Sequence, residues 1–282
     1  MFFSTFSSLS GRASFVFVVL GAAVLACGGT PAAAPASSPP VGSAPVYDTA
    51  HGGRLFDKWS AETKQDGASP DRLKNLFGWD LRGAAGMYGP SYMAKKTAVD
   101  LDLLTWQGDV GQVADRLARG EGPVPAYSAV LSRPQLEALA SFVVAERDGT
   151  LPRADSILTL ASPAAKDYAL RTGGNAAHGK ELFAARCASC HGADGAQFLL
   201  DDGEYSLGSH ARQKAYEDWF KILNGQPGTG MKRQVTGTTA AAMTQEILDI
   251  LTALCDRTAF PVGKAKKADV ADGDPRCGAA LR

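Results

Sequence analysis

The sequence predicts a mainly α protein with two tandem helical domains, at residues 46–150 and 176–257. The segment H-G-G-R-L-F at residues 51–56 repeats as H-G-K-E-L-F at residues 178–183. Each half also closes on an amphipathic helix, and residues 151–175, which join the halves, contain two prolines and a pair of glycines. A chain of 282 residues with 45% hydrophobic content has enough apolar side chains for two small cores.

The first 26 residues have the pattern of an export signal. Arg12 supplies positive charge, and the apolar run at residues 13–26 is too short to span a membrane comfortably. The run ends in V-L-A-C, which is similar to a bacterial lipobox, so we predict that Cys27 is lipidated and becomes the mature N-terminus. An ordinary cleaved signal with an incidental cysteine is the alternative. After Cys27, the uncharged Gly, Ala, Pro and Ser residues up to position 45 predict a flexible tether.

Helices are expected at both ends of the first half. One begins near His51, and a second follows Ser132, which is a good N-cap residue. This second helix carries its apolar residues on one face: Leu136, Leu139, Phe142 and Val143. In the second half, the run from Met243 to Leu254 predicts the corresponding closing helix.

The second half contains a C-A-S-C-H pentapeptide at residues 187–191. Cys187 and Cys190 have the spacing that attaches c-type haem, with His191 as the adjoining iron ligand. A redox dithiol and half of a zinc site are the alternatives. A dithiol of this kind is expected in a thioredoxin-like βαβ setting, and a zinc site needs further Cys or His ligands at comparable spacing. Neither is visible in the sequence.

The flanking motifs resemble those of class I cytochromes c over residues 176–257. They are G-x-x-L-F before the pentapeptide, C-A-S-C-H-G-A-D-G at it, and G-Q-P-G-T-G-M ending at Met231. The resemblance implies one covalently bound haem c with Met231 as the sixth iron ligand. Three alternatives stay open. Met231 could be a plain core methionine, Met243 could be the sixth ligand in its place, or His210 could bind the iron to give bis-histidine coordination. A helix containing Tyr216, Trp219, Phe220 and Ile222, ended by Asn224 and Gly225, is expected to pack on the haem.

The first half resembles the first domain of two-domain dihaem cytochromes c, with its haem site lost. The motif G-W-D-L-R-G at residues 78–83 follows positions where the haem cysteines and histidine would be, and these hold Leu73, Leu76 and Phe77. Val124 takes the place of the distal methionine. We expect Trp59, Trp79 and Tyr88 to help fill the volume that haem would occupy. A dissociable b-type haem held by His51 and by Met87 or Met93 is the alternative.

The two remaining cysteines are expected to pair. With Cys27 lipidated and Cys187 and Cys190 bound to haem, Cys255 and Cys277 are left, and an exported protein tends to oxidise such a pair. The disulfide would hold the polar tail at residues 258–282 to the haem-binding domain.

These expectations together describe a monohaem cytochrome that transfers single electrons to a redox partner protein. It would be lipid-anchored at the periplasmic face of a bacterial membrane, inner or outer, and would be an electron carrier rather than a stand-alone enzyme. The formal net charge of zero gives no reason to expect nucleic acid as a partner. A haem oxidase, peroxidase or gas sensor with a displaceable sixth ligand is one alternative. Another is a docking module in which the haem-free first domain binds the partner. Deletion of residues 46–150 would test it.

Overall fold

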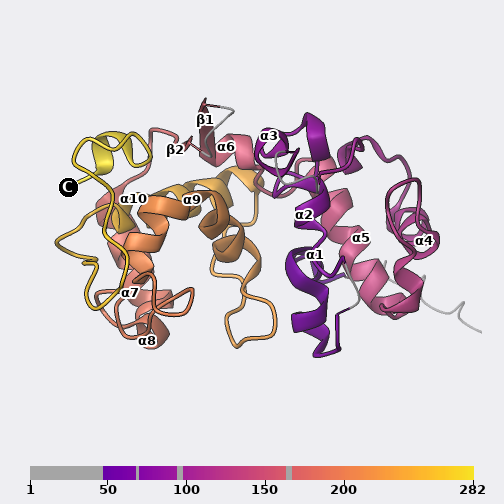
Figure 1. Cartoon of the computed structure of the whole chain (residues 1–282), viewed down its shortest axis with the longest axis horizontal. Coiled ribbons are helices and arrows are strands. Elements are labelled where there is room, and N and C mark those ends of the chain that lie inside the picture. The colour runs from indigo at the N-terminus through magenta and orange to yellow at the C-terminus, as the bar shows by residue number, and fades with distance from the viewer. Residues whose placement is uncertain (1–46, 68–69, 94–97, 163–166) are drawn as a thin grey trace, which may run out of the picture. The chain divides into compact units, whose positions relative to one another are not determined.

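The computed structural model describes residues 47–67, 70–93, 98–162 and 167–282. The expected signal segment, Cys27 and the tether lie outside the described residues. Contacts between Cα atoms group Pro45–Arg282 into one compact unit, which is mainly helical. Figure 1 shows its elements.

The first half consists of helices joined by short loops and 3-10 turns. They are α1 (Thr49–Thr63), α2 (Lys74–Phe77), α3 (Gly89–Met93), α4 (Val110–Arg119) and α5 (Arg133–Arg147). The side chain of Asp48 caps α1 by accepting hydrogen bonds from the backbone N–H groups of Ala50 and His51. As predicted, Ser132 is the N-cap of α5, and its own N–H donates to the side chain of Gln135.

Glycine sets how closely the first and last helices of this half approach. A Cβ atom added to Gly52 of α1 would lie 2.0 Å from the backbone oxygen of Ala138 on α5. The same relation recurs between α7 and α10 of the second half, where a Cβ on Gly179 would lie 1.9 Å from the backbone oxygen of Asp249. The repeated H-G dipeptide therefore marks two helix crossings, each requiring a residue without a side chain.

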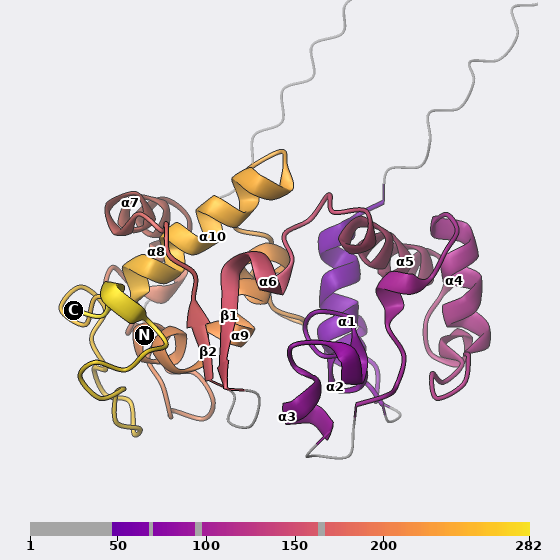
Figure 2. The ribbon, with the colours of Figure 1, turned by 90° about the horizontal axis from the view of Figure 1, so that it is seen from above.

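A short helix and a β-hairpin follow the first half. The elements α6 (Ala154–Ile157), β1 (Leu158–Ser162) and β2 (Asp167–Leu170) lead into the second half (Figure 2). The strands are antiparallel, with Leu158 opposite Leu170 and Leu160 opposite Tyr168. Residues 151–175 were expected only to connect the two halves. They contribute Leu158 and Tyr168 to the core, and both side chains are buried.

The second half contains α7 (Ala176–Arg186), α8 (Ala188–His191), α9 (Leu207–Asn224) and α10 (Ala240–Leu254). The helix predicted between Met243 and Leu254 is therefore present, and α10 packs on α7. Met243 is buried in the core, as its apolar helix face requires. Helix α9 ends at Asn224, and Gly225 caps it with a φ of 92°.

The core of the first half is completed by a ring from the second. Phe220 of α9 is fully buried, and its ring centroid lies 4.7 Å from Trp79, 5.6 Å from Phe142 and 6.1 Å from Phe56. The sequence led us to expect Phe220 on the haem side of its helix. Of the residues expected to fill this space, Leu73, Phe77, Trp59, Trp79 and Tyr88 are buried, whereas Leu76 is only partly buried.

Polar contacts also join the two halves. The carboxylate of Asp57 on α1 pairs with Lys74 of α2 at 2.6 Å and with Lys221 of α9. Burial raises the pKa of Asp57, but the two lysine charges outweigh burial and hold this pKa below its ordinary value. Nearby, the indole N–H of Trp219 donates to the hydroxyl of Tyr88 at 3.0 Å. Helix α9 therefore belongs to the cores of both halves.

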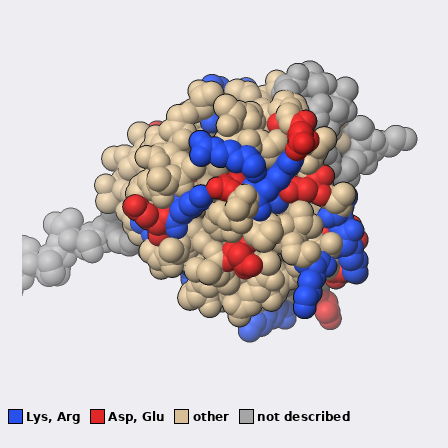
Figure 3. All heavy atoms as spheres, turned by 90° about the vertical axis from the view of Figure 1, so that its left-hand side faces the viewer, with Lys and Arg blue, Asp and Glu red and all other residues tan. Residues whose placement is uncertain are grey.

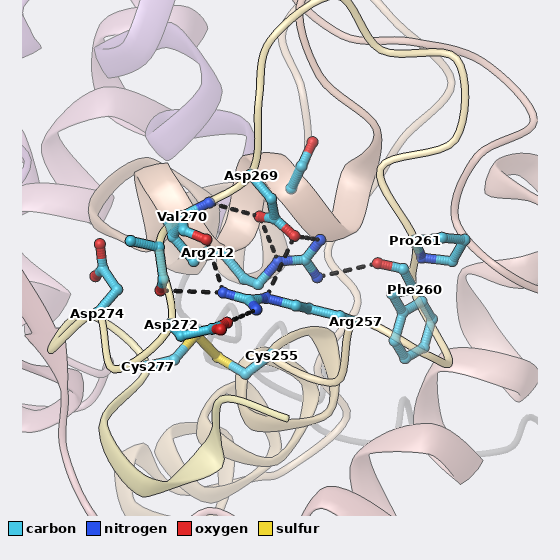
Figure 4. Close-up of polar contacts among 12 residues, drawn as sticks. Arg212, Cys255, Arg257, Phe260, Pro261, Asp269, Val270, Asp272, Asp274 and Cys277 are labelled. Carbon is cyan, nitrogen blue, oxygen red and sulfur yellow. Dashed lines mark hydrogen bonds and ion pairs between the residues drawn. A yellow bond between two sulfur atoms is a disulfide. The ribbon is translucent and has the colours of Figure 1, made fainter.

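The C-terminal segment is held against the second half by a disulfide and two arginines (Figure 4). Cys255 at the end of α10 is bonded to Cys277. Arg212 of α9 is fully buried and donates to the carboxylate of Asp269 and to the backbone oxygens of Leu254 and Phe260. Arg257 donates to Asp272 and to the backbone oxygen of Val270. The segment expected to be a polar tail is thus fixed in place.

Candidate haem site

The three residues of the haem-attachment motif lie on one turn of helix. Cys187 is the junction between α7 and α8, and its backbone oxygen accepts from the N–H groups of Cys190 at 3.1 Å and His191 at 2.9 Å. Residues three and four positions apart are neighbours on a helix surface, so Cys190 and His191 both lie next to Cys187 on this turn. Gly192, with a φ of 80°, then turns the chain away. This arrangement suits two thioether bonds and one axial ligand on a single porphyrin.

The surroundings of Cys187 differ from those of a redox-active thiol. Cys187 and Cys190 are not bonded to one another, and Cys187 is half-buried while Cys190 is exposed. Burial raises the pKa of Cys187 to about 11. Redox-active C-x-x-C motifs work in the opposite direction, with a thiol pKa lowered by a helix terminus or a neighbouring cation.

His191 is shaped for a ligand role. Burial lowers the pKa of its imidazole, more than the charge of Asp218 raises it, which favours the neutral form that binds metals. Its Nδ1 atom is buried and has no hydrogen-bond partner among the described residues. The ring of Phe198, which is 44% exposed, lies 4.7 Å from the imidazole. No proline lies between His191 and Pro227, and no carbonyl among the described residues accepts from Nδ1 to orient the ring.

Met231 lies in a separate, closed turn between α9 and α10. Its backbone oxygen accepts from the N–H of Gln226 at 3.1 Å, and its own N–H donates to the hydroxyl of Thr229 at 3.1 Å. A Cβ atom on Gly225 would lie 2.4 Å from the backbone oxygen of Met231, so glycine is needed at the start of the turn. Met231 is half-buried. Its place opposite His191 stays a prediction.

His210 is held by carboxylates in the structure. This residue of α9 is buried, its Nδ1 lies 2.9 Å from Asp218 and its Nε2 lies 3.6 Å from Asp201. Burial lowers the pKa of His210, but the carboxylates raise it further, to about 10. A protonated imidazole has no lone pair for iron. His210 therefore serves as the cation of a buried ion pair in this arrangement, and not as a sixth ligand.

The remaining candidate ligands have other contacts. His51 of the first half lies 3.7 Å from the carboxylate of Glu62, and burial lowers its pKa. Met87 is half-buried, and the side chain of Met93 lies outside the described residues. His178 pairs with the buried Asp249 at 2.7 Å. Cys255 and Cys277 are joined by a disulfide, with their Cα atoms 6.0 Å apart.

The surface around the second half carries both signs of charge. Figure 3 shows Lys and Arg beside Asp and Glu on the face that contains the C-terminal segment. Lys214 pairs with Asp201, and Lys266 donates to the backbone oxygen of Asp202 at 2.7 Å. Within the described ranges no helix is long and apolar enough to cross a membrane. The same ranges hold no group of three or more His, Cys, Asp or Glu residues arranged to bind a metal ion.

The paired thiols, the neighbouring imidazole and the helical turn that carries them have the arrangement that covalent attachment of haem requires. Comparison with protein families agrees, because the family model described as cytochrome c matches residues 176–253. The match supports a cytochrome c domain in this part of the chain, with the covalent haem and electron transfer that the family implies. No curated protein matches the chain. Cys187, Cys190 and His191 fit a covalently bound haem, since both thiols are free and the His191 imidazole favours its neutral form.

Two neighbours of the site were not found from the sequence. Asp218 pairs with His210 and its charge also acts on His191, and Glu62 of α1 contacts the turn that leads to Met231. If residues 207–224 are predicted as one helix, Asp218 lies two turns after His210 on the same face, so this pair could have been predicted. Nothing in the sequence pairs Glu62 with a turn so far along the chain.

Proposed function

We propose that this protein is a monohaem c-type cytochrome that carries single electrons between protein partners. The observation that supports this most is the C-A-S-C-H turn on α8, inside the segment that matches the cytochrome c family. When bound, haem supplies an iron that accepts and releases one electron. Cys187 and Cys190 would hold the porphyrin, while His191 and Met231 would occupy both axial positions. With both positions filled, no open site is left for O₂ or peroxide.

Intact mass of the mature protein, made in a host with haem-attachment machinery, tests this proposal. We expect an increment of one haem, which Cys187→Ala together with Cys190→Ala abolishes. A low-spin spectrum and slow CO binding to the ferrous protein would agree with two strong axial ligands. Rapid CO binding by a five-coordinate ferrous form would instead favour an oxidase, peroxidase or sensor.

We further propose that the first half is a cytochrome c-like domain without haem. Its first and last helices cross at Gly52 as α7 and α10 cross at Gly179, which supports a shared template. Buried Leu73 and Phe77 stand at the positions of the missing motif, and Phe220 packs against Phe56, which in turn contacts Phe77. A mass increment of one haem, and no second haem extracted by acid, is the expected result. A second, dissociable haem would contradict the proposal.

Anchoring and location follow from the N-terminal sequence. We propose that Cys27 is lipidated and that the protein lies at the periplasmic face of a bacterial membrane, held by its acyl chains. Each buried methylene contributes about 0.8 kcal/mol, so several chains give firm attachment. Fractionation of cells producing the wild type and Cys27→Ser tests this. We expect the variant to leave the membrane fraction, and membrane retention of the variant would refute the anchor.

A further inference from the structure

A carboxylate of the first half holds the turn that carries Met231. Gly228 lies in this turn, and its backbone N–H donates to Oε2 of Glu62 on α1 at 3.0 Å. The other oxygen of the same carboxylate accepts from Nε of Arg54 at 2.8 Å. Both side chains are largely buried, at 10% exposed for Glu62 and 6% for Arg54. Glu62 therefore has a fixed position from which it binds Gly228.

Arg54 extends this contact to the end of α9. Its Nη1 atom donates to the backbone oxygen of Asn224 at 2.9 Å, in the last turn of the helix before the Met231 turn. Asn224 is fully buried, and a Cβ atom on Gly53 of α1 would lie 2.3 Å from its side chain. One arginine and one carboxylate thus bind the chain on both sides of Gly225, where it changes direction.

Two further contacts tie the turn to α1. Gly228 has a φ of 73°, and a Cβ atom added to it would lie 2.7 Å from the backbone oxygen of Ala61. After Met231, Arg233 donates to the hydroxyl of Thr49 at 2.9 Å and to the backbone oxygen of Leu223 at 2.8 Å. The turn is therefore held by α1 before and after the methionine.

We propose that Glu62, oriented by Arg54, is a positioning residue of the first half that keeps the Met231 turn in place for the iron. This inference rests on the proposed function, in which Met231 is the sixth ligand. A bond between iron and a thioether is weak enough to be displaced by stronger ligands, so the backbone on either side must hold the sulfur in position. In this protein that backbone is bound by another half of the chain. The haem-free half then sets how readily the sixth position opens.

The test compares Glu62→Gln and Glu62→Ala with the wild type and with Glu137→Gln, a matched change at an ion-paired glutamate on the surface of α5. Hydrogen exchange at the Gly228 amide, measured on the full chain with and without haem, reports directly on its hydrogen bond to Glu62. Loss of a hydrogen bond to a charged group predicts exchange about tenfold faster in Glu62→Ala. Cyanide binding to the ferric protein should accelerate by a similar factor, and the near-infrared charge-transfer band of methionine-bound ferric haem should weaken. Glu62→Gln should lie between wild type and alanine.

Gly228→Ala provides a second route to the same result. Its methyl group would displace the turn from Ala61 while leaving the carboxylate in place, so faster cyanide binding is again expected. Unchanged exchange and cyanide binding in Glu62→Ala, in a wild-type background that shows the methionine band, would overturn the inference alone. A wild type that binds haem but lacks the band would overturn the proposed ligand set and the inference with it.

Discussion

Replacing Phe220 with alanine should destabilise both halves of the described unit together. The ring is fully buried and contacts three rings of the first half, yet it belongs to a helix of the second half. Truncation of a buried phenylalanine removes its transfer free energy and leaves a cavity, at a cost of about 3–5 kcal/mol. Aromatic pairs contribute about 0.5–1.5 kcal/mol beyond area burial, so three such contacts place our expectation near the upper end of that range.

Urea unfolding of the full-chain holoprotein, followed by tryptophan fluorescence and by haem absorbance, measures the effect. Three of the four tryptophans, Trp59, Trp79 and Trp106, lie in the first half, so fluorescence reports mainly on that half, and haem absorbance reports on the second. Both signals should shift to lower urea by the same amount. Glu217→Ala, one turn earlier on α9 and partly exposed, should change the free energy of unfolding by no more than about 0.5 kcal/mol. Two separate transitions, with only one shifted by Phe220→Ala, would refute the shared core.

Three other changes have defined outcomes. Cys255→Ser with Cys277→Ser opens a loop with a sequence separation of 22 residues, and the chain-entropy relation predicts a loss of about 3 kcal/mol in urea unfolding. Burial lowers the pKa of His210, but neighbouring carboxylates raise it further, to about 10. The contribution of protonated His210 to folding stability is therefore fully present below about pH 6.5 and is lost as pH rises through 10. His210→Gln should remove that pH dependence, and an unchanged profile would contradict the assignment. Gly52→Ala and Gly179→Ala should each cost about 1–3 kcal/mol by forcing crossing helices apart, measurable as a lower melting temperature.

Local sequence patterns predicted the helices because the physics behind them is local. Ser132 caps α5 and Gly225 ends α9, since each residue satisfies or permits its own backbone geometry. The haem-attachment turn is equally local, because Cys187, Cys190 and His191 are fixed by one turn of helix. Periodicity also predicted that Met243 packs in the core.

The contacts between the halves could not be predicted in this way. An apolar side chain such as Phe220 could pack equally well against haem or against another core. The sequence therefore does not predict its contact with Trp79. Glu62 and Gly228 are far apart along the chain, and no periodicity relates a helix terminus to a glycine-rich turn. The hairpin of β1 and β2 was missed because two short strands between prolines and glycines resemble a linker in composition.

The shared helix also changes how a docking role for the first half must be tested. Deleting residues 46–150 would leave Phe220 without its aromatic partners and Lys221 without Asp57, so the second half would lose stability along with any binding surface. A loss of partner binding in that deletion would therefore say nothing about docking. Arg119 is exposed on α4, and changing its charge leaves the core intact. If the first half docks a redox partner through this helix, Arg119→Glu should slow electron transfer while leaving haem content and unfolding unchanged.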